Sequence, residues 1–286
     1  MIKAQSPKPK ISNLRSLTEG VLLVLILLLA GALRLWRLDE IPPGFTHDEA
    51  GHGHDARAIL NGARPIYETV GYGREPLYDY WVAGLMVVMD GPPGRALRFS
   101  VVPLGLMTLL ASYAWIRLAF DRQTALATTA LQAASFWSLA TARQALRSGL
   151  LPVLFTAAVY FFWRVWGGGR QREGSKGDDR LPALPRPYIM MIGVLIGATL
   201  YTYLPARVVW VVFPAFLAYL AVWHCGVFRR VWLPTFGAVA LGWLLAAPMF
   251  FWLYQHPGAE QRLAMLDAPL EALRRGDPSV VLSRAW

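Results

Sequence analysis

Three polar residues at helical spacing, Asp48, His52 and Asp55, form the group in this sequence best suited to chemistry. Their i, i+4, i+7 pattern places all three side chains on one face of a helix. That face would offer a carboxylate with an imidazole and a second acid beside it, a set suited to removing a proton from a hydroxyl. The pattern therefore predicts a general-base site, with Asp48 as the base.

The residues around this group predict a short helix that would hold it. The Thr46 hydroxyl can bond the Glu49 amide while the Glu49 carboxylate reaches back, which forms a capping box. The helix should end near Asn61, because Gly62 follows it. We count Asp48 and Glu49 as catalytic candidates. The alternative is that both acids have a structural role: Glu49 would complete the capping box, and both carboxylates would complement the helix dipole.

Metal binding is the alternative use of the same segment. The side chains that could bind an ion are His47, His52, His54 and Asp55. Their spacing does not match the usual zinc signatures, and two glycines between them weaken a rigid helical site. We assign no metal ligands here. No cofactor follows from the sequence, and a divalent metal ion stays open.

Two other segments carry candidate substrate-binding residues. Arg74 can fork onto phosphate oxygens, and the adjacent Glu75 can orient a ligand or a metal. The alternative is an arginine that reaches the membrane surface and pairs with an acid. Arg143 and Arg147 are four residues apart on one predicted helical face, at the extracytoplasmic end of a predicted membrane span. Basic residues are unusual on that side of a membrane. The pair therefore indicates an anionic partner, such as a polyprenyl phosphate.

The last candidates come from a turn further along the chain. Tyr201, Tyr203 and Arg207 would add aromatic and cationic side chains on the extracytoplasmic side of the membrane, the side predicted for Arg143 and Arg147. The two tyrosines would equally suit an interfacial aromatic belt. With His52 and Asp55, these residues complete the predicted substrate-binding set.

The composition indicates which elements must position these residues. Of 286 residues, 55% are hydrophobic and only 16% are charged, which is typical of a polytopic α-helical membrane protein. The net charge of +10 is better explained by basic cytoplasmic loops than by nucleic-acid binding, so no nucleic-acid partner is expected. The single cysteine, Cys225, excludes an internal disulfide.

Seven apolar segments are about long enough to cross a membrane. They are Leu17–Trp36, Phe99–Leu118, Thr124–Ala140, Leu150–Trp166, Tyr188–Tyr203, Val208–Trp223 and Trp232–Tyr254. An eighth segment, Leu77–Met89, is short and bounded by prolines, which favours a position along the membrane surface.

The basic loop 167–187 decides the topology. It carries a net charge of +2 and should stay cytoplasmic, which requires that Leu77–Met89 does not cross. The predicted organisation is a cytoplasmic tail (1–16), a transmembrane module (17–254) and an extracytoplasmic interfacial tail (255–286). The module would carry a long first extracytoplasmic loop (37–98) with interfacial helices. The absence of an eighth span before Trp286 suggests a truncated chain.

These motifs together resemble the GT-C glycosyltransferases that use polyprenyl-phosphate sugars, especially the protein mannosyltransferase and aminoarabinose transferase branch. The resemblance covers about residues 15–255. It rests on Arg34–Leu38, Asp48-Glu49, Arg74–Leu77, Arg98 and Thr141–Gly149.

The resemblance implies a role for several of these residues. Asp48 would be the general base of an inverting displacement at the anomeric carbon. Arg74, Arg143 and Arg147 would hold the departing lipid phosphate. Two features depart from the family pattern. Thr141–Gly149 contains no acid, although relatives often carry one there for metal binding, and relatives tend to be longer.

The sequence therefore predicts a multi-pass enzyme of the cell (inner or plasma) membrane, with a cytoplasmic N-terminus and an extracytoplasmic active site. It would transfer a sugar from a polyprenyl-phosphate donor to a hydroxyl of a protein, lipid or glycan acceptor, in contact with membrane lipid. Two alternatives stay open: a transporter or flippase for lipid-linked sugars, and a truncated non-catalytic subunit of a glycosylation complex.

Overall fold

The structure, a computed structural model, describes residues 10–89, 93–170, 186–277 and 279. These residues form helices and no strand, which confirms the all-α prediction. The helices are α1 (Lys10–Leu35), α2 (His47–Leu60), α3 (Leu77–Val88), α4 (Pro93–Phe99), α5 (Val101–Ala119), α6 (Arg122–Ala134), α7 (Phe136–Thr141), η1 (Arg147–Gly149), α8 (Leu150–Arg170), α9 (Arg186–Thr199), α10 (Ala206–Val209), α11 (Val212–Trp223), α12 (Cys225–Gln255) and α13 (Gln261–Arg274).

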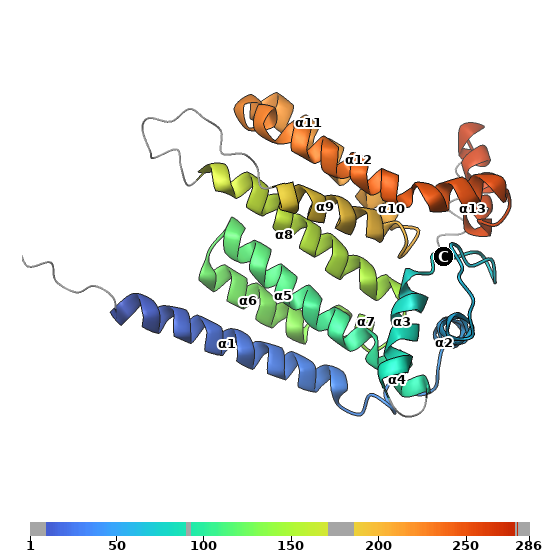
Figure 1. The fold of residues 1–286 in the computed structure, drawn as a ribbon, viewed down its shortest axis with the longest axis horizontal. Helices are drawn as coiled ribbons and strands as arrows, with labels where there is room; N and C mark the ends of the chain where they lie inside the picture. The colour runs from blue at the N-terminus through green and yellow to red at the C-terminus, as the bar shows by residue number, and fades with distance from the viewer. Residues whose placement is uncertain (1–9, 90–92, 171–185, 278, 280–286) are drawn as a thin grey trace, which may run out of the picture.

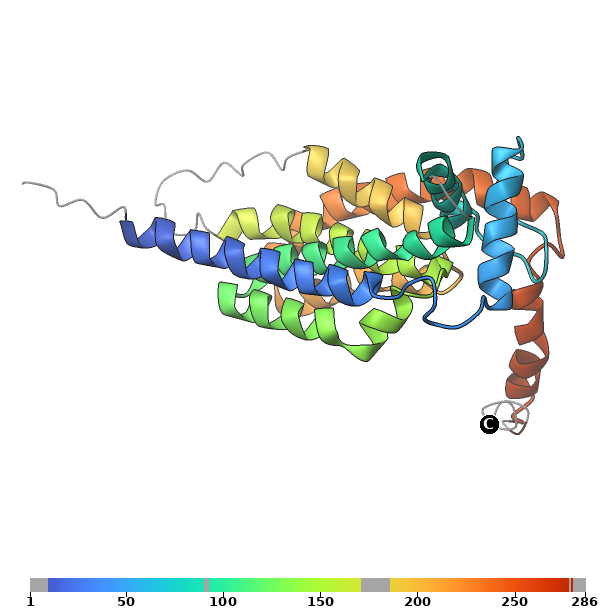
Figure 2. The same cartoon turned by 90° about the horizontal axis from the view of Figure 1, so that it is seen from below.

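The long helices lie side by side in one bundle. Helices α1, α5, α6, α8, α9 and α12 run along the long axis of the molecule, whereas α2, α3 and α13 gather at one end of it (Figures 1 and 2). Most candidate site residues belong to this end or to the turns that reach it. The bundle therefore acts as a frame that holds the candidate site at a single end.

Five helical segments in the described part of the chain are long and apolar enough to cross a membrane. They are Ser16–Leu35, Pro93–Ala119, Arg147–Val165, Ala206–Trp223 and Cys225–Gln255. The protein is therefore a multi-pass membrane protein, but the predicted count of seven spans is not confirmed.

Two predicted spans account for the difference in number. Segment Thr124–Ala140 is divided between α6 and α7. The backbone of Ser135 is extended, which ends α6, and the Ser135 side chain caps α7 by accepting a hydrogen bond from the Ser138 N–H. Segment Tyr188–Tyr203 overlaps only with α9, whose 14 residues are too few to count as a span.

The short helix α3 crosses the end of the bundle instead of running along it (Figure 1). Its 12 residues would extend about 18 Å, against a hydrocarbon core of about 30 Å. A helix of this length and direction suits the membrane surface, the position predicted for Leu77–Met89. Placement relative to a bilayer stays a prediction.

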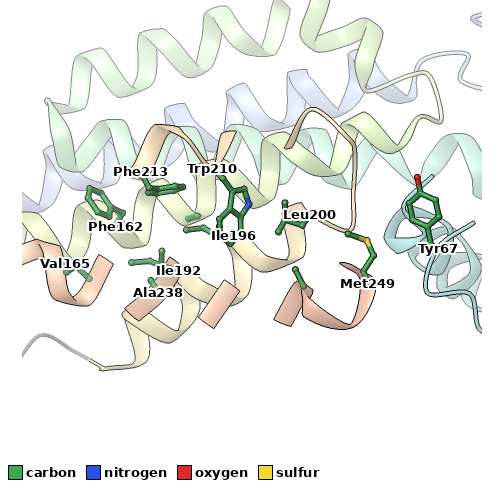
Figure 3. Close-up of a cluster of buried hydrophobic side chains, with 12 residues drawn as sticks. Tyr67, Phe162, Val165, Ile192, Ile196, Leu200, Trp210, Phe213, Ala238 and Met249 are labelled. Atoms are coloured by element: carbon green, nitrogen blue, oxygen red, sulfur yellow. The ribbon is translucent and has the colours of Figure 1, made fainter. Parts of the chain in front are cut away.

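The largest apolar core lies between α8, α9, α11 and α12 (Figure 3). Phe162 and Phe213 make an edge contact in it, with ring centroids 6.2 Å apart. Helices α9 and α12 approach closely because Gly193 and Gly197 have no side chain, a spacing that lets membrane helices pack backbone to backbone.

Substituting Gly193 tests this close approach. A Cβ atom there would lie 2.8 Å from the Ala238 carbonyl oxygen and from Leu241 Cδ2, so Gly193→Ala should destabilise the fold by about 1–3 kcal/mol. Gly237→Ala on α12 is the matched control, because its Cβ would meet nothing within 4 Å. We expect the control to be neutral or slightly stabilising. The free energy of unfolding in mixed micelles measures both, and equal values would contradict the packing argument.

Candidate active site

The start of α2 has the predicted capping geometry. The Glu49 N–H donates to Thr46 Oγ1 (3.2 Å), and Glu49 Oε2 accepts from the Thr46 N–H (2.9 Å) and from its hydroxyl (3.1 Å). The helix ends at Leu60 with Asn61 as its C-cap, and Gly62 follows at φ +106°. The capping box and the predicted helix end are both confirmed. The structure thus fixes Asp48 in the first turn of this helix.

The two adjacent acids of this turn lie in opposite environments. Glu49 is fully buried, and its Oε1 accepts the Ala145 N–H (3.0 Å) and lies 3.9 Å from Arg98 Nε. Asp48 is exposed, with 65% of its side chain accessible. Glu49 therefore ties α2 to the segment before α8, whereas the Asp48 carboxylate is available to a substrate.

A cleft of about 90 Å³ opens beside Asp48. Its lining comes from five separate parts of the chain: Asp48, His52, Arg74, Leu146, Arg147, Ser148, Tyr203 and Arg262. Three of these side chains are guanidinium groups and one is an exposed carboxylate. The arrangement can bind an anionic group with its arginines and accept a proton with Asp48.

A chain of charged side chains supports the arginine side of the cleft. Arg147 is 5% exposed; its Nη1 lies 3.9 Å from Glu75 Oε2, and its guanidinium lies over the Tyr203 ring at 5.3 Å. Arg207 lies 3.9 Å from the other Glu75 oxygen and bonds Glu260. Burial raises the pKa of Glu75, and the charges of Arg147 and Arg207 oppose that rise.

One nitrogen of the Arg147 guanidinium lacks a hydrogen-bond acceptor in the described part of the chain. This Nη1 atom is buried and has no hydrogen-bond partner within the described residues, since 3.9 Å to Glu75 exceeds hydrogen-bond distance. Leaving a charged donor unsatisfied is costly. The Arg147 guanidinium is therefore only partly satisfied by its neighbours.

Behind the opposite wall, α2 is tied to the loop and to α3. His52 Nδ1 lies 2.6 Å from Asp79 Oδ1, and the His52 ring meets the Tyr78 ring edge-on at 4.9 Å. Asp55 forms an ion pair with Arg74. His52 and Arg74 both reach the cleft, so these buried acids orient two of its lining side chains.

The structure does not bring every predicted site residue to the cleft. Residues 142–146 are not helical, so Arg143 and Arg147 do not share a helical face. Arg143 instead donates to carbonyl oxygens at the end of α1, including Leu33 (2.7 Å) and Trp36 (2.8 Å). Free carbonyls at a helix end attract a cation, which explains its position outside the cleft.

Other candidates also lie apart from the cleft. The Tyr201 hydroxyl donates to the Leu245 carbonyl (2.9 Å), and the Tyr201 carbonyl accepts the Leu77 N–H (3.1 Å). His47 and His54, which belong to the alternative of a metal site, have exposed side chains.

Sequence reasoning missed three residues of this region. Arg262 lies on α13, and its N–H donates to the Tyr72 carbonyl (3.3 Å), but nothing in its local pattern connects it with α2. Ser148 has no distinguishing signal either. Asp79 did have one, because an acid within an otherwise apolar 12-residue helix is unusual enough to indicate function.

No protein-family model and no curated protein matches the sequence. Solved structures of membrane enzymes do match its fold. The Archaeoglobus fulgidus oligosaccharyltransferase matches with a TM-score of 0.64 at 17% identity, over 93% of this chain and 36% of that one. The Saccharomyces cerevisiae protein O-mannosyltransferase Pmt1–Pmt2, bound to its sugar donor, matches at 0.60 and 17% identity, over 85% and 34%.

A third match is ArnT from Cupriavidus metallidurans bound to undecaprenyl phosphate, with a TM-score of 0.58 at 16% identity over 86% of this chain and 42% of that one. All three proteins are GT-C glycosyltransferases, so this chain has the GT-C membrane fold. It spans between 34% and 42% of the length of these three chains.

Proposed function

We propose that this protein transfers a sugar from a polyprenyl-phosphate donor to an acceptor hydroxyl on the extracytoplasmic side of the cell membrane. The observation that carries the proposal is the cleft, where an exposed Asp48 carboxylate shares one small space with Arg74, Arg147 and Arg262. An acid beside several guanidinium groups fits a base and an anionic leaving group in one reaction. The GT-C fold supports this assignment, because its solved examples include one with a bound sugar donor and one with undecaprenyl phosphate.

The proposed reaction is a single inverting displacement. The acceptor oxygen attacks the anomeric carbon while the bond from that carbon to the donor phosphate oxygen breaks. Asp48 takes the proton of the acceptor hydroxyl, and the electron pair of the broken bond remains on the polyprenyl phosphate. Arg74, Arg147 and Arg262 stabilise the negative charge that grows on that phosphate. The acceptor would be a protein, lipid or glycan hydroxyl.

Transfer by the purified chain in lipid vesicles tests the proposal. Polyprenyl-phosphate hexoses and pentoses labelled in the sugar are supplied with a hydroxyl acceptor, and the configuration of the product linkage is determined. We expect a labelled product of inverted configuration. Donor binding without transfer would favour the transporter alternative, and absence of both would contradict the proposed function.

Arg147 gives a second test of the same site. Removing its guanidinium deletes a charged hydrogen-bond donor, typically worth about 1.5–3 kcal/mol, so Arg147→Ala should weaken binding of polyprenyl phosphate by a factor of about 10–150. Calorimetry in detergent measures this affinity.

Arg143→Ala is the matched control for Arg147, because Arg143 contacts α1 carbonyl oxygens and does not line the cleft. It should leave the affinity for polyprenyl phosphate unchanged while lowering the thermal stability. An equal loss of affinity in both variants would contradict the assignment of Arg147 to the phosphate.

A further inference from the structure

Three acidic side chains from three different elements converge behind the cleft wall. Asp55 belongs to α2, Asp79 belongs to α3, and Glu68 belongs to the segment between these helices. One carboxylate oxygen from each acid lies within 4.8 Å of the corresponding oxygens of the other two. Asp55 and Asp79 are buried, and Glu68 is partly buried. Such convergence of like charge away from water requires compensation.

The protein supplies only part of that compensation. Arg74 pairs with Asp55, and His52 Nδ1 bonds Asp79 Oδ1 at 2.6 Å. With a neutral His52, three carboxylates against one guanidinium leave two negative charges unbalanced. The exposed His54 lies 3.5 Å from Asp55 Oδ1 at the edge of the group. A bound ion of charge +2 would make the group neutral.

The second observation is an orphaned oxygen. Asp79 is fully buried, and its Oδ2 has no hydrogen-bond partner within the part of the chain that the structure describes. A buried carboxylate oxygen normally finds a donor, because an unmet one costs the full desolvation penalty. Asp79 is also one of the three acids that converge. Its free oxygen therefore indicates a missing electropositive partner at this place.

The electrostatics of the group agree with these contacts. Burial, together with the charges of Asp55 and Asp79, raises the pKa of Glu68 to about 7. Burial likewise raises the pKa of Asp79, against the lowering effect of His52. Carboxylate oxygens this close together and this far from water repel one another, and an added positive charge would offset that repulsion. A single proton can be shared by only two carboxylates, whereas a cation can contact all three.

We propose that Asp55, Glu68 and Asp79 bind one divalent cation of the hard, oxygen-preferring class: Ca²⁺, Mg²⁺ or Mn²⁺. Such ions take carboxylate oxygens at about 2.0–2.6 Å, so two ligand oxygens on opposite sides of one ion are about 4–5 Å apart. The observed separations of up to 4.8 Å fall within that range. An all-carboxylate group suits these ions better than softer metals, which prefer nitrogen and sulfur ligands.

The proposed ion would join α2, the following loop and α3 at one point. Asp55 contacts Arg74, and Asp79 contacts His52, and both partners line the cleft. The ion would therefore position one wall of the cleft without contacting the substrate. This proposal concerns ion binding and does not depend on sugar transfer.

Binding of Mn²⁺ to the full chain tests the proposal directly. Protein in detergent is freed of metal with EDTA and dialysed, and free Mn²⁺ is then titrated by electron paramagnetic resonance. We expect one Mn²⁺ per chain, and an affinity at least about tenfold weaker in Glu68→Gln and in Asp79→Asn. Glu271→Gln, which changes an exposed acid on α13, should bind as the wild type does. Ca²⁺ or Mg²⁺ should raise the thermal-unfolding midpoint of the wild type more than that of Glu68→Gln.

Glu68→Gln is the decisive variant, because a partly buried loop side chain can be changed without opening the core. Size-exclusion chromatography checks that each variant is folded. Absence of Mn²⁺ binding, or equal affinity in the wild type and Glu68→Gln, would overturn the proposal. Binding that is lost in Asp48→Asn but kept in Glu68→Gln would place the ion in the cleft and overturn it as well. Neither result would depend on whether transfer is observed.

Discussion

Asp48→Asn is expected to lower the rate of sugar transfer by a factor of about 10²–10⁴, the usual contribution of a general base. Asparagine has almost the same shape but cannot take the proton of the acceptor hydroxyl. Asp48 is exposed and lines the cleft, and the hydrogen bond that ties α2 to the segment before α8 is accepted by Glu49 instead. The loss should therefore appear in kcat, with donor affinity and stability close to those of the wild type.

The control for Asp48 is Asp267→Asn, the same chemical change at an exposed acid on α13 that does not line the cleft. Initial rates in vesicles at saturating donor compare the three proteins. If Asp48→Asn transfers sugar as fast as Asp267→Asn, then Asp48 is not the base. His52 would be the next candidate, since it is the other cleft side chain able to accept a proton.

The parts of this site that could be predicted are those determined by neighbours in the sequence. The capping box at Thr46 and Glu49, and the helix end before Gly62, depend on residues three or four positions apart. The apolar character of the chain likewise predicts a helical membrane protein without reference to tertiary contacts. Local hydrogen bonding and composition carry this information, so the sequence contains it directly.

The parts that could not be predicted depend on contacts between distant segments. Arg143 and Arg147 look equivalent in sequence, yet a break in helical structure between them sends one to α1 and the other to the cleft. Arg262 reaches the cleft from more than two hundred residues beyond Asp48. The division of the predicted third span at Ser135 is different, because the Ser135 cap on the Ser138 N–H is a local signal that the surrounding apolar run masked.

Glu49→Ala should destabilise the fold by about 3–5 kcal/mol, the range for removal of one partner from a buried charged pair. Glu49 is fully buried and accepts bonds from the Thr46 N–H, the Thr46 hydroxyl and the Ala145 N–H. Alanine leaves these donors without partners and leaves the Arg98 guanidinium, 3.9 Å away, without its acid. Glu49→Gln retains an acceptor and most of the shape, so its loss should be smaller.

The adjacent acid provides the control that separates structure from chemistry. Asp48→Ala changes a neighbouring first-turn carboxylate that is exposed, so it should cost no more than about 1 kcal/mol in stability. Unfolding titrations with a denaturing detergent measure both variants. Glu49→Ala that is as stable as Asp48→Ala would contradict a structural role for Glu49. We expect opposite results for the two acids. Asp48 variants should stay folded and transfer little sugar, whereas the transfer rate of Glu49→Ala should fall only in proportion to the fraction of protein that is unfolded. Burial alone distinguishes these neighbours, because the capping box directs one carboxylate inward and leaves the other facing the cleft.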